Sequence, residues 1–223
     1  MMQIAPTCPH LGVGLYSYAD AARLLKIRPA RLRRWVSGPD GFLPHRLDVG
    51  EDILTFDDLI EAHFVLMYLS EGVGLKVIKK AAEAAASKYQ TNYPFSVKRF
   101  DTDGKTIYAT LIEDKTNKRY LEDLNKGQYV FEKILRPFFR KLEYNQANQL
   151  VGYWPAGKRG RILLDPARKF GKPIDAETGI PTRTIFNALQ AGGGQSPVDV
   201  ARWLDIPLAA VRASAAFERS LAT

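Results

Sequence analysis

The amino-acid sequence predicts a mainly α-helical protein with small β elements. Near the start and the end of its 223 residues, helical patterns begin at serine or threonine caps. Runs in which apolar and polar residues alternate are confined to the middle, and one helix-pair motif occurs twice. The length suits two or more modules. We therefore predict a winged helix-turn-helix domain over 1–90, a middle β-hairpin and helix region over 91–160, and a three-helix, helix-turn-helix-like domain over 161–223.

The repeated motif reads SYADAARLLKIRPARLRRW at 17–35 and SPVDVARWLDIPLAAVRAS at 196–214. Both copies begin with a serine, carry an aspartate three residues later and place an isoleucine in the middle. The serine is a good N-cap, and the aspartate can meet the unpaired amides of the first turn. Two short helices joined by a tight turn with an apolar residue make a helix-turn-helix.

Around this motif, the pattern predicts a second helix that starts at Pro29 and an extended wing that follows it. Later helices begin at the Thr55 cap and after the Gly72–Gly74 break. In the middle, FSVKRF and KTIYATLI around Asp103-Gly104 predict a hairpin, and VGYW and RILL predict a second one. The predicted helices, with Pro137 interrupting the fifth, cover 17–25, 29–36, 56–70, 75–88, 128–144, 182–191, 197–204 and 208–219.

Composition narrows the class of protein. The content of 46% hydrophobic residues supports a real core, and Cys8 is the single cysteine, which suits a reducing compartment. The start lacks the pattern of a signal peptide, and the most apolar helix is too short to span a bilayer. We therefore expect a soluble, cytoplasmic protein without a membrane partner.

The net charge of +8 and the pI near 9.5 indicate an anionic partner, because the basic residues are clustered. Residues 16–36 contain six basic residues against one acidic residue, and residues 136–172 contain nine against two. The first cluster lies on the N-terminal helix pair. Arginines there can clamp phosphates or pair with guanine in the major groove.

We therefore predict a DNA-binding surface on this helix pair and its wing. Alternatively, the arginines of the helix form a solvated basic face, and the wing is an ordinary surface loop. Arg23 could instead form a salt bridge with Asp20. The predicted DNA-binding residues are Arg23, Arg28, Arg31, Arg33, Arg34, His45 and Arg46.

The second copy of the motif has different chemistry. Where the first copy has Arg28, Arg31 and Arg34, the second has proline and two alanines, and 196–219 has no net charge. Such a face suits packing against protein and offers phosphate nothing. The alternative is that the alanines are core of a three-helix unit. The predicted interface residues are Pro207, Ala210, Ala213 and Phe217.

No catalytic or metal-binding pattern emerges. His10, His45 and His63 lie in different predicted elements without a metal-ligand spacing, and Gly12-Val13-Gly14 lacks the third glycine of a dinucleotide loop. The serines show no nucleophile elbow. We expect a protein that is not an enzyme and that uses no cofactor or metal.

The first ninety residues resemble the DNA-binding domain of the MerR regulators. The resemblance rests on YSYADAARLLKIRPARLRRWV, the wing, and LTFDDLIEAHFVLMYLSEGVGLKVIKKAA. It departs from that family after this point, because Pro94 and a predicted hairpin stand where MerR dimers carry a long helix. Any dimerisation must therefore use another element.

The tail from Arg161 to Arg219 resembles the helical domain of VapB-type antitoxins, a domain long of unknown function. The resemblance rests on GKPI, the following threonine, arginine and isoleucine cluster, the glycine after the first helix, and the Ser-led helix pair. The cluster reads GIPTRTI here, which departs from the more frequent Gly-Thr-Arg-Ile-Pro order at Arg183.

Together the two resemblances imply the antitoxin of a type II toxin–antitoxin pair. Such a protein would neutralise a PIN-domain, VapC-like ribonuclease by direct binding and would bind its own operator, as a homodimer or a toxin–antitoxin hetero-oligomer. The alternative is a MerR-like regulator whose C-terminal part binds a ligand or sets the oligomeric state.

The middle basic segment has three readings under these hypotheses. It could extend the DNA contact, meet the metal-binding carboxylates of a PIN ribonuclease, or serve solubility. The candidate toxin-binding residues are Arg136, Arg140, Lys158, Arg159, Arg161 and Arg168.

Overall fold

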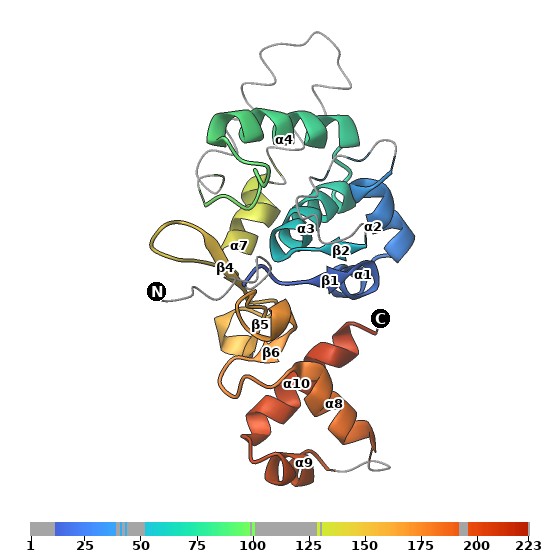
Figure 1. Cartoon of the computed structure of the whole chain (residues 1–223), viewed down its shortest axis with the longest axis vertical. Helices are drawn as coiled ribbons and strands as arrows, with labels where there is room; N and C mark the ends of the chain where they lie inside the picture. Colours follow the sequence, from blue (N-terminus) through green and yellow to red (C-terminus); the bar gives the residue numbers. More distant parts are fainter. Residues whose placement is uncertain are drawn as a thin grey trace, which may run out of the picture. The chain divides into compact units, whose positions relative to one another are not determined.

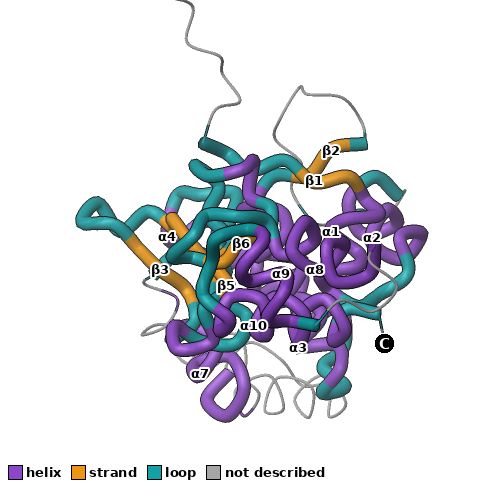
Figure 2. Tube along the Cα trace, turned by 90° about the horizontal axis from the view of Figure 1, so that it is seen from below, coloured by secondary structure: helices purple, strands orange, loops and turns teal. Residues whose placement is uncertain are grey.

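The computed structural model describes residues 12–38, 41, 43, 52–98, 100, 129, 131–191 and 196–222 (Figure 1). The chain divides into two compact units. The large unit is Ser17–Leu150, and the C-terminal unit joins the stretch that ends at Tyr16 to Val151–Thr223. Helices dominate the described residues and the strands are short (Figure 2), as the mainly α prediction with small β elements requires. The three-part domain division stays a prediction.

Side-chain caps start helices of the large unit at Ser17 and at Thr55. Thr55 starts α3 with a reciprocal box, in which its Oγ1 accepts from the Asp58 amide at 3.1 Å and its own amide donates to Asp58 Oδ2 at 2.8 Å. The elements are β1 (Tyr16–Ser17), α1 (Tyr18–Leu25), α2 (Pro29–Val36), β2 (Ile53–Leu54), α3 (Phe56–Ser70), α4 (Leu75–Tyr89), η1 (Phe131–Leu135), α7 (Arg136–Phe139) and β3 (Leu142–Tyr144).

The C-terminal unit combines short strands with three helices. In Figure 1, α8 and α10 lie side by side and α9 joins them at one end. The elements are β4 (Leu150–Tyr153), η2 (Lys158–Gly160), β5 (Ile162–Leu163), η3 (Lys169–Gly171), β6 (Ile174–Asp175), α8 (Thr182–Ala191), α9 (Pro197–Trp203) and α10 (Leu208–Ser220). The predicted three helices are present within a residue of their expected ends.

Among the described residues the strands form three two-stranded sheets, which pair β1 with β2, β3 with β4 and β5 with β6. The β5–β6 pair is antiparallel, with Ile162 opposite Asp175. The predicted hairpin of VGYW with RILL is therefore only partly right. Tyr153 and Leu164 exchange backbone hydrogen bonds of 2.9 Å in both directions, but β4 and β5 take other partners.

Two further predictions for the middle region were wrong. Residues 94–98 form turns instead of the predicted FSVKRF strand, and its predicted partner at 105–112 lies outside the described residues. The predicted helix over 128–144 stops at Phe139, and Leu142–Tyr144 is the strand β3. Pro137 stands in the first turn of α7, directly after a π-helical turn at η1.

The large unit is built around aromatic rings on α3. Phe64 is buried, and its ring centroid lies 5.1 Å from those of Phe138 and Phe139 and 6.1 Å from that of Phe95. The centroid of the His63 ring lies 4.6 Å from that of Phe138, with the two rings tilted by 54°. Burial, assisted by the charge of Lys141, lowers the pKa of His63 to about 4. His63 is therefore a neutral packing residue at physiological pH.

The C-terminal unit has its own apolar core, formed by one side of each of its three helices. Ile185 of α8, Val200 of α9 and Val211 of α10 are all fully buried. The Thr182 hydroxyl donates to the buried Glu218 carboxylate, which joins the start of α8 to the end of α10. This polar contact satisfies both groups inside the core.

Within this unit, Gly171 permits a close backbone approach that no other residue would allow. Its φ is +79°, and its carbonyl accepts the Tyr16 hydroxyl at 2.6 Å. A Cβ at Gly171 would collide with the Tyr16 hydroxyl and ring. Burial raises the pKa of Tyr16, because the phenolate would lie in this enclosed contact.

We expect Gly171→Ala to lower the free energy of unfolding by about 3 kcal/mol, because it adds a clash to the strain of a positive φ. The matched control is Gly157→Ala, since Gly157 has φ +75° and no atom within 4 Å of a Cβ. That variant should lose only about 1 kcal/mol. Urea denaturation measures both losses, and equal losses would show that Tyr16 moves away without cost.

Candidate functional site

The two copies of the repeated motif start in the same way. Ser17 Oγ accepts a hydrogen bond from the Asp20 amide at 3.1 Å, and Ser196 Oγ accepts one from the Asp199 amide at 3.2 Å. Each serine hydroxyl also donates to the carboxylate of its aspartate, at 2.7 and 2.6 Å. The predicted caps of α1 and α9 are confirmed.

The turns of the two copies match as well. Each has one residue in the left-handed region, Lys26 with φ 56° and Asp205 with φ 52°. The next residue is an isoleucine whose amide donates a hydrogen bond to the carbonyl five residues earlier. The bond from Ile27 to Ala22 measures 2.9 Å, and the bond from Ile206 to Ala201 measures 3.0 Å. The sequence repeat is therefore a repeat of backbone structure, α1–α2 in one copy and α9–α10 in the other.

In the first copy, α2 is anchored by apolar residues and presents arginines outward. Leu32 is fully buried and Trp35 is nearly so, while Arg31, Arg33 and Arg34 are exposed. The helix has no acidic residue in its first turn. The outward face of α2 is therefore strongly cationic.

The arginines on this face are held to different degrees. Arg33 pairs with the exposed Asp52 at 2.9 Å and its guanidinium lies 5.0 Å from the ring centroid of Tyr18. Arg31 lies 5.0 Å from the ring centroid of Trp35. Within the described part of the chain, Arg28 and Arg34 make no ion pair. Arg33 is thus partly neutralised, and Arg28, Arg31 and Arg34 retain donors for an anion.

The remaining predicted DNA-binding residues are placed less fully. Arg23 lies on α1, half-buried and with partners inside the protein. His45 and Arg46 lie outside the described residues, so the structure does not test their place in a wing. The strand β2, which ends the predicted wing, pairs with β1.

In the second copy, the positions of Arg28, Arg31 and Arg34 carry no charge, whereas Arg212 stands at the position of Arg33. Pro207 is exposed and Ala213 and Phe217 are half-buried, whereas Ala210 is fully buried in the helical core. Ala210 therefore belongs to the core of the three-helix unit, as the alternative interpretation of this face predicted. The interface role of the other three stays a prediction.

Two apolar side chains of α9 were missed by the sequence reasoning. The exposed fraction of Trp203 is 72% and that of Val198 is 49%. A helix of only seven residues is too short for its periodicity to show which side faces outward. Exposed tryptophan is the residue type most enriched at the centre of protein interfaces.

The basic residues of the middle segment fall in both units. Arg136 and Arg140 belong to the large unit, and Lys158, Arg159, Arg161 and Arg168 belong to the C-terminal unit. Arg168 donates to the carbonyl of Ala176 at 3.3 Å, and Arg161 is engaged in an ion-pair network. The other four are exposed.

The Arg161 network fixes the β5–β6 hairpin. Its Nε and Nη2 donate to the two oxygens of Asp175, at 2.8 and 3.1 Å, and Nη1 lies 2.7 Å from Glu177 Oε2. The side chain of Asp175 is fully buried. Burial raises the pKa of Asp175, but hydrogen bonds from Arg161 and Thr178 outweigh it and hold the pKa below its usual value.

We expect Arg161→Met to lower the free energy of unfolding by about 3 kcal/mol at pH 7, because it leaves the buried carboxylate of Asp175 without its cation. Because the pKa of Asp175 is lowered in the folded state, the ion pair stabilises the protein at pH values above the usual pKa of an aspartate. The destabilisation caused by Arg161→Met should therefore shrink as the pH falls toward 3. The double variant Arg161→Met with Asp175→Asn should recover most of the loss. Urea denaturation at several pH values measures this, and a loss independent of pH would contradict the pairing.

The described residues offer neither a metal site nor a membrane span. They hold no group of three or more histidine, cysteine, aspartate or glutamate side chains that could bind a metal ion. No helix among them is long and apolar enough to cross a membrane.

Comparison with known proteins relates the chain to a named protein by sequence and to a solved structure by fold. A scan against protein-family models found no match. The chain is 23% identical over 207 residues to a protein named "Putative antitoxin VapB45" from Mycobacterium tuberculosis, with 81% of this chain and 84% of that protein covered. The crystal structure of Rv2018 from Mycobacterium tuberculosis is similar with a TM-score of 0.73 at 19% identity, over 92% of this chain and 99% of that one. The structural similarity shows a shared fold, and the sequence similarity relates this chain to an antitoxin-like protein.

Proposed function

We propose that this protein is the antitoxin of a type II toxin–antitoxin pair. It binds operator DNA through a MerR-like winged helix-turn-helix made of α1, α2 and the segment up to β2. It binds and inhibits a PIN-domain, VapC-like ribonuclease through its C-terminal unit. The similarity to a protein with an antitoxin name supports the general role.

The proposal rests on one backbone motif that occurs twice, with a cationic surface in one copy and an uncharged, apolar surface in the other. The α1–α2 pair presents Arg28, Arg31 and Arg34, and the α9–α10 pair presents Pro207 and the exposed Trp203. Phosphate groups require cations, whereas a protein partner favours exposed aromatic and apolar groups. A chain that must hold DNA and a protein at the same time needs both kinds of surface.

The proposed toxin-facing surface combines the outer side of α9 with basic residues of the same unit. Lys158 and Arg159 are exposed and can pair with carboxylates of a ribonuclease active site. Arg161 and Arg168 instead hold the C-terminal unit together, so substituting them would confound folding with binding. A homodimer or a toxin–antitoxin hetero-oligomer would align two α2 helices on a palindromic operator.

The decisive experiment is rescue from toxicity. The reading frame adjacent to this gene is expressed alone and together with this chain, and cell growth and RNA cleavage are measured. We expect growth arrest with the neighbour alone, recovery with both, and co-purification of the two proteins. An active-site carboxylate variant of the neighbour is the control for toxicity.

A neighbour that arrests growth without rescue would contradict the antitoxin role. Operator binding that persists in that case would leave the MerR-like regulator, with a C-terminal unit for ligand or oligomer contacts. The two functions are thus separated by one pair of assays on the same full-length chain.

A further inference from the structure

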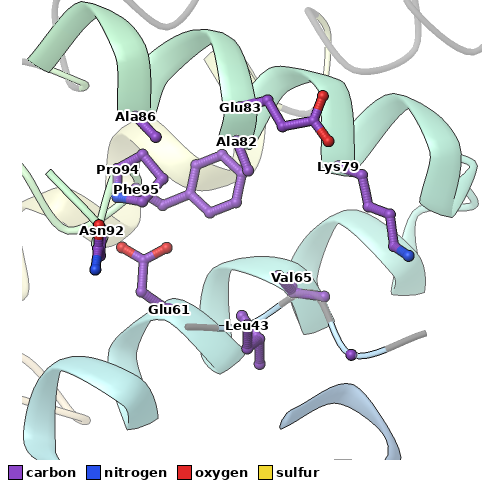
Figure 3. A pocket seen from close by; sticks show the side chains of 11 residues that line it. Leu43, Glu61, Val65, Lys79, Ala82, Glu83, Ala86, Asn92, Pro94 and Phe95 are labelled. Carbon is purple, nitrogen blue, oxygen red and sulfur yellow. The ribbon is translucent and has the colours of Figure 1, made fainter. Parts of the chain in front are cut away.

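A pocket in each of the two units contains charged side chains, but they differ in what they still offer a ligand. The pocket between α3 and α4 of the large unit is lined by the buried Glu61 (Figure 3). Its Oε1 already accepts the amide and the hydroxyl of Ser96, both at 2.7 Å. A pocket of about 600 Å³ in the C-terminal unit is lined instead by two cations, together with four uncharged residues: Arg168, Lys169, Thr178, Gly179, Ile180 and Pro181.

The guanidinium of Arg168 is fixed at the wall of this second pocket. Arg168 is half-buried, and its Nη1 donates to the carbonyl of Ala176 at 3.3 Å. A Cβ on Gly179 would lie only 2.9 Å from Nη2, so the bare backbone of this glycine, with φ +71°, leaves the room that the guanidinium fills. A guanidinium has five N–H donors, and the bond to Ala176 uses one of them. The others remain for a ligand in a set orientation.

A strained turn brings the second cation to the same pocket. Lys169 and Phe170 both have left-handed backbones, with φ 50° and 56°, although neither is a glycine. Such residues persist only where the surrounding structure requires them, and they concentrate at functional sites. Neighbouring side chains of an extended segment point to opposite sides. The change from extended backbone at Arg168 to left-handed backbone at Lys169 lets both residues line one pocket.

The charges of these two cations are not neutralised within the described residues. Neither Arg168 nor Lys169 forms an ion pair there, and the pocket lining contains no acid. The acids of the adjoining segment, Asp175 and Glu177, both pair with Arg161. Two cations at one pocket without an acid match a ligand group that carries two negative charges.

The size of the pocket and its other walls indicate a ligand larger than a bare anion. A volume of about 600 Å³ is within the range of pockets that bind small organic molecules, and Ile180 and Pro181 add apolar surface. A phosphate monoester carries a charge of about −1.5 to −2 at pH 7 and three acceptor oxygens. We propose that this pocket binds a small organic phosphate monoester, with its phosphate on Arg168 and Lys169. The proposed operator and toxin surfaces do not include these residues.

The test is isothermal titration calorimetry of the full-length protein with three probes. Phenyl phosphate is a monoester with two negative charges, methyl phenyl phosphate is a diester with one, and inorganic phosphate lacks the organic group. We expect phenyl phosphate to bind about ten-fold more tightly than either of the others. Equal binding of the diester would indicate the general attraction of a basic protein for phosphodiesters and would overturn the proposal. Equal binding of inorganic phosphate, or no saturable heat with phenyl phosphate, would overturn it as well.

A matched pair of lysine variants places the binding in this pocket. Lys169→Gln removes a lining cation and should lower the affinity for phenyl phosphate about ten-fold. Lys172→Gln removes a lysine three residues later that lies outside the lining, and it should change the affinity by less than about two-fold. Both side chains are exposed, so neither change should alter the fold. Equal losses would show that net charge alone attracts the probe and would overturn the proposal.

Arg168→Lys tests the oriented guanidinium. The variant keeps the charge but loses the planar fork, so the affinity for phenyl phosphate should fall about ten-fold. Unchanged affinity would exclude Arg168 from the site. Thermal unfolding checks the fold of this variant, and the lysine pair decides the question if Arg168→Lys unfolds, because Lys169→Gln leaves the bond to Ala176 in place. None of these outcomes depends on whether a toxin partner or an operator exists.

Discussion

Replacing Arg31 and Arg34 together with alanine should weaken operator binding at least 30-fold while leaving toxin binding unchanged. Both side chains are exposed on α2, and each contact to a base or phosphate contributes about 1–3 kcal/mol. Among the described residues, Arg34 has no ion partner and Arg31 contacts the ring of Trp35. Their donors are therefore available to DNA.

The measurement is a titration of the DNA upstream of the gene at several salt concentrations. If Arg28, Arg31 and Arg34 of a dimer contact phosphate, the slope of log K against log salt should be about −5, and the double variant should reduce it to about −2. A flat salt dependence of the unmodified protein would remove the DNA-binding assignment.

The repeat itself supplies a matched control. Arg202→Ala with Arg212→Ala removes the same charge from the second copy, where both side chains are exposed. This variant should bind operator within two-fold of the unmodified protein. If it weakens binding as much as the α2 variant does, general charge rather than the α2 surface attracts the DNA.

The helices could be predicted because their signals are local. Ser17, Thr55 and Ser196 each cap a helix through an amide three residues later, so a few neighbouring residues define where the helix begins. The mainly α class and most helix ends follow from such signals. The predicted arginine surface also rests on local spacing, because residues three apart on one helix share a face.

The parts that sequence could not predict depend on distant residues. Leu142–Tyr144 is a strand because a later strand pairs with it, and nothing within the segment distinguishes it from the end of a helix. Tyr16 packs on Gly171, which is 155 residues away, so the C-terminal unit includes residues that precede α1. Long-range pairing of this kind leaves no periodic signal in a single sequence.

The buried acid on α3 and the tryptophan on α9 illustrate the same limit at the level of sites. Glu61 lies in a helix that is apolar on most of its sides, and only the packing of the turn at Ser96 shows how its carboxyl group is accommodated there. Trp203 has the residue type of a core, and only the tertiary structure shows that it is exposed. The sequence supplied the chemistry of these groups but not their surroundings.

Trp203→Ala should weaken toxin binding at least 30-fold and leave operator binding unchanged. A tryptophan at the centre of an interface commonly contributes 2 kcal/mol or more, and Trp203 is 72% exposed on a helix whose opposite side is core. Because the side chain contributes little to the core of the free protein, its removal should cost little stability. Surface plasmon resonance with immobilised toxin measures the affinity, and thermal unfolding checks the fold.

Leu75→Ala is the matched control, since Leu75 is also an exposed apolar side chain on a helix but belongs to the large unit. It should bind toxin normally. Val198→Ala, on α9 itself, should give an intermediate loss, because Val198 is exposed on the same helix with a smaller side chain. Unchanged affinity in both α9 variants would exclude α9 from the interface and transfer the toxin contact to the exposed Lys158 and Arg159, whose double alanine variant would then carry the loss.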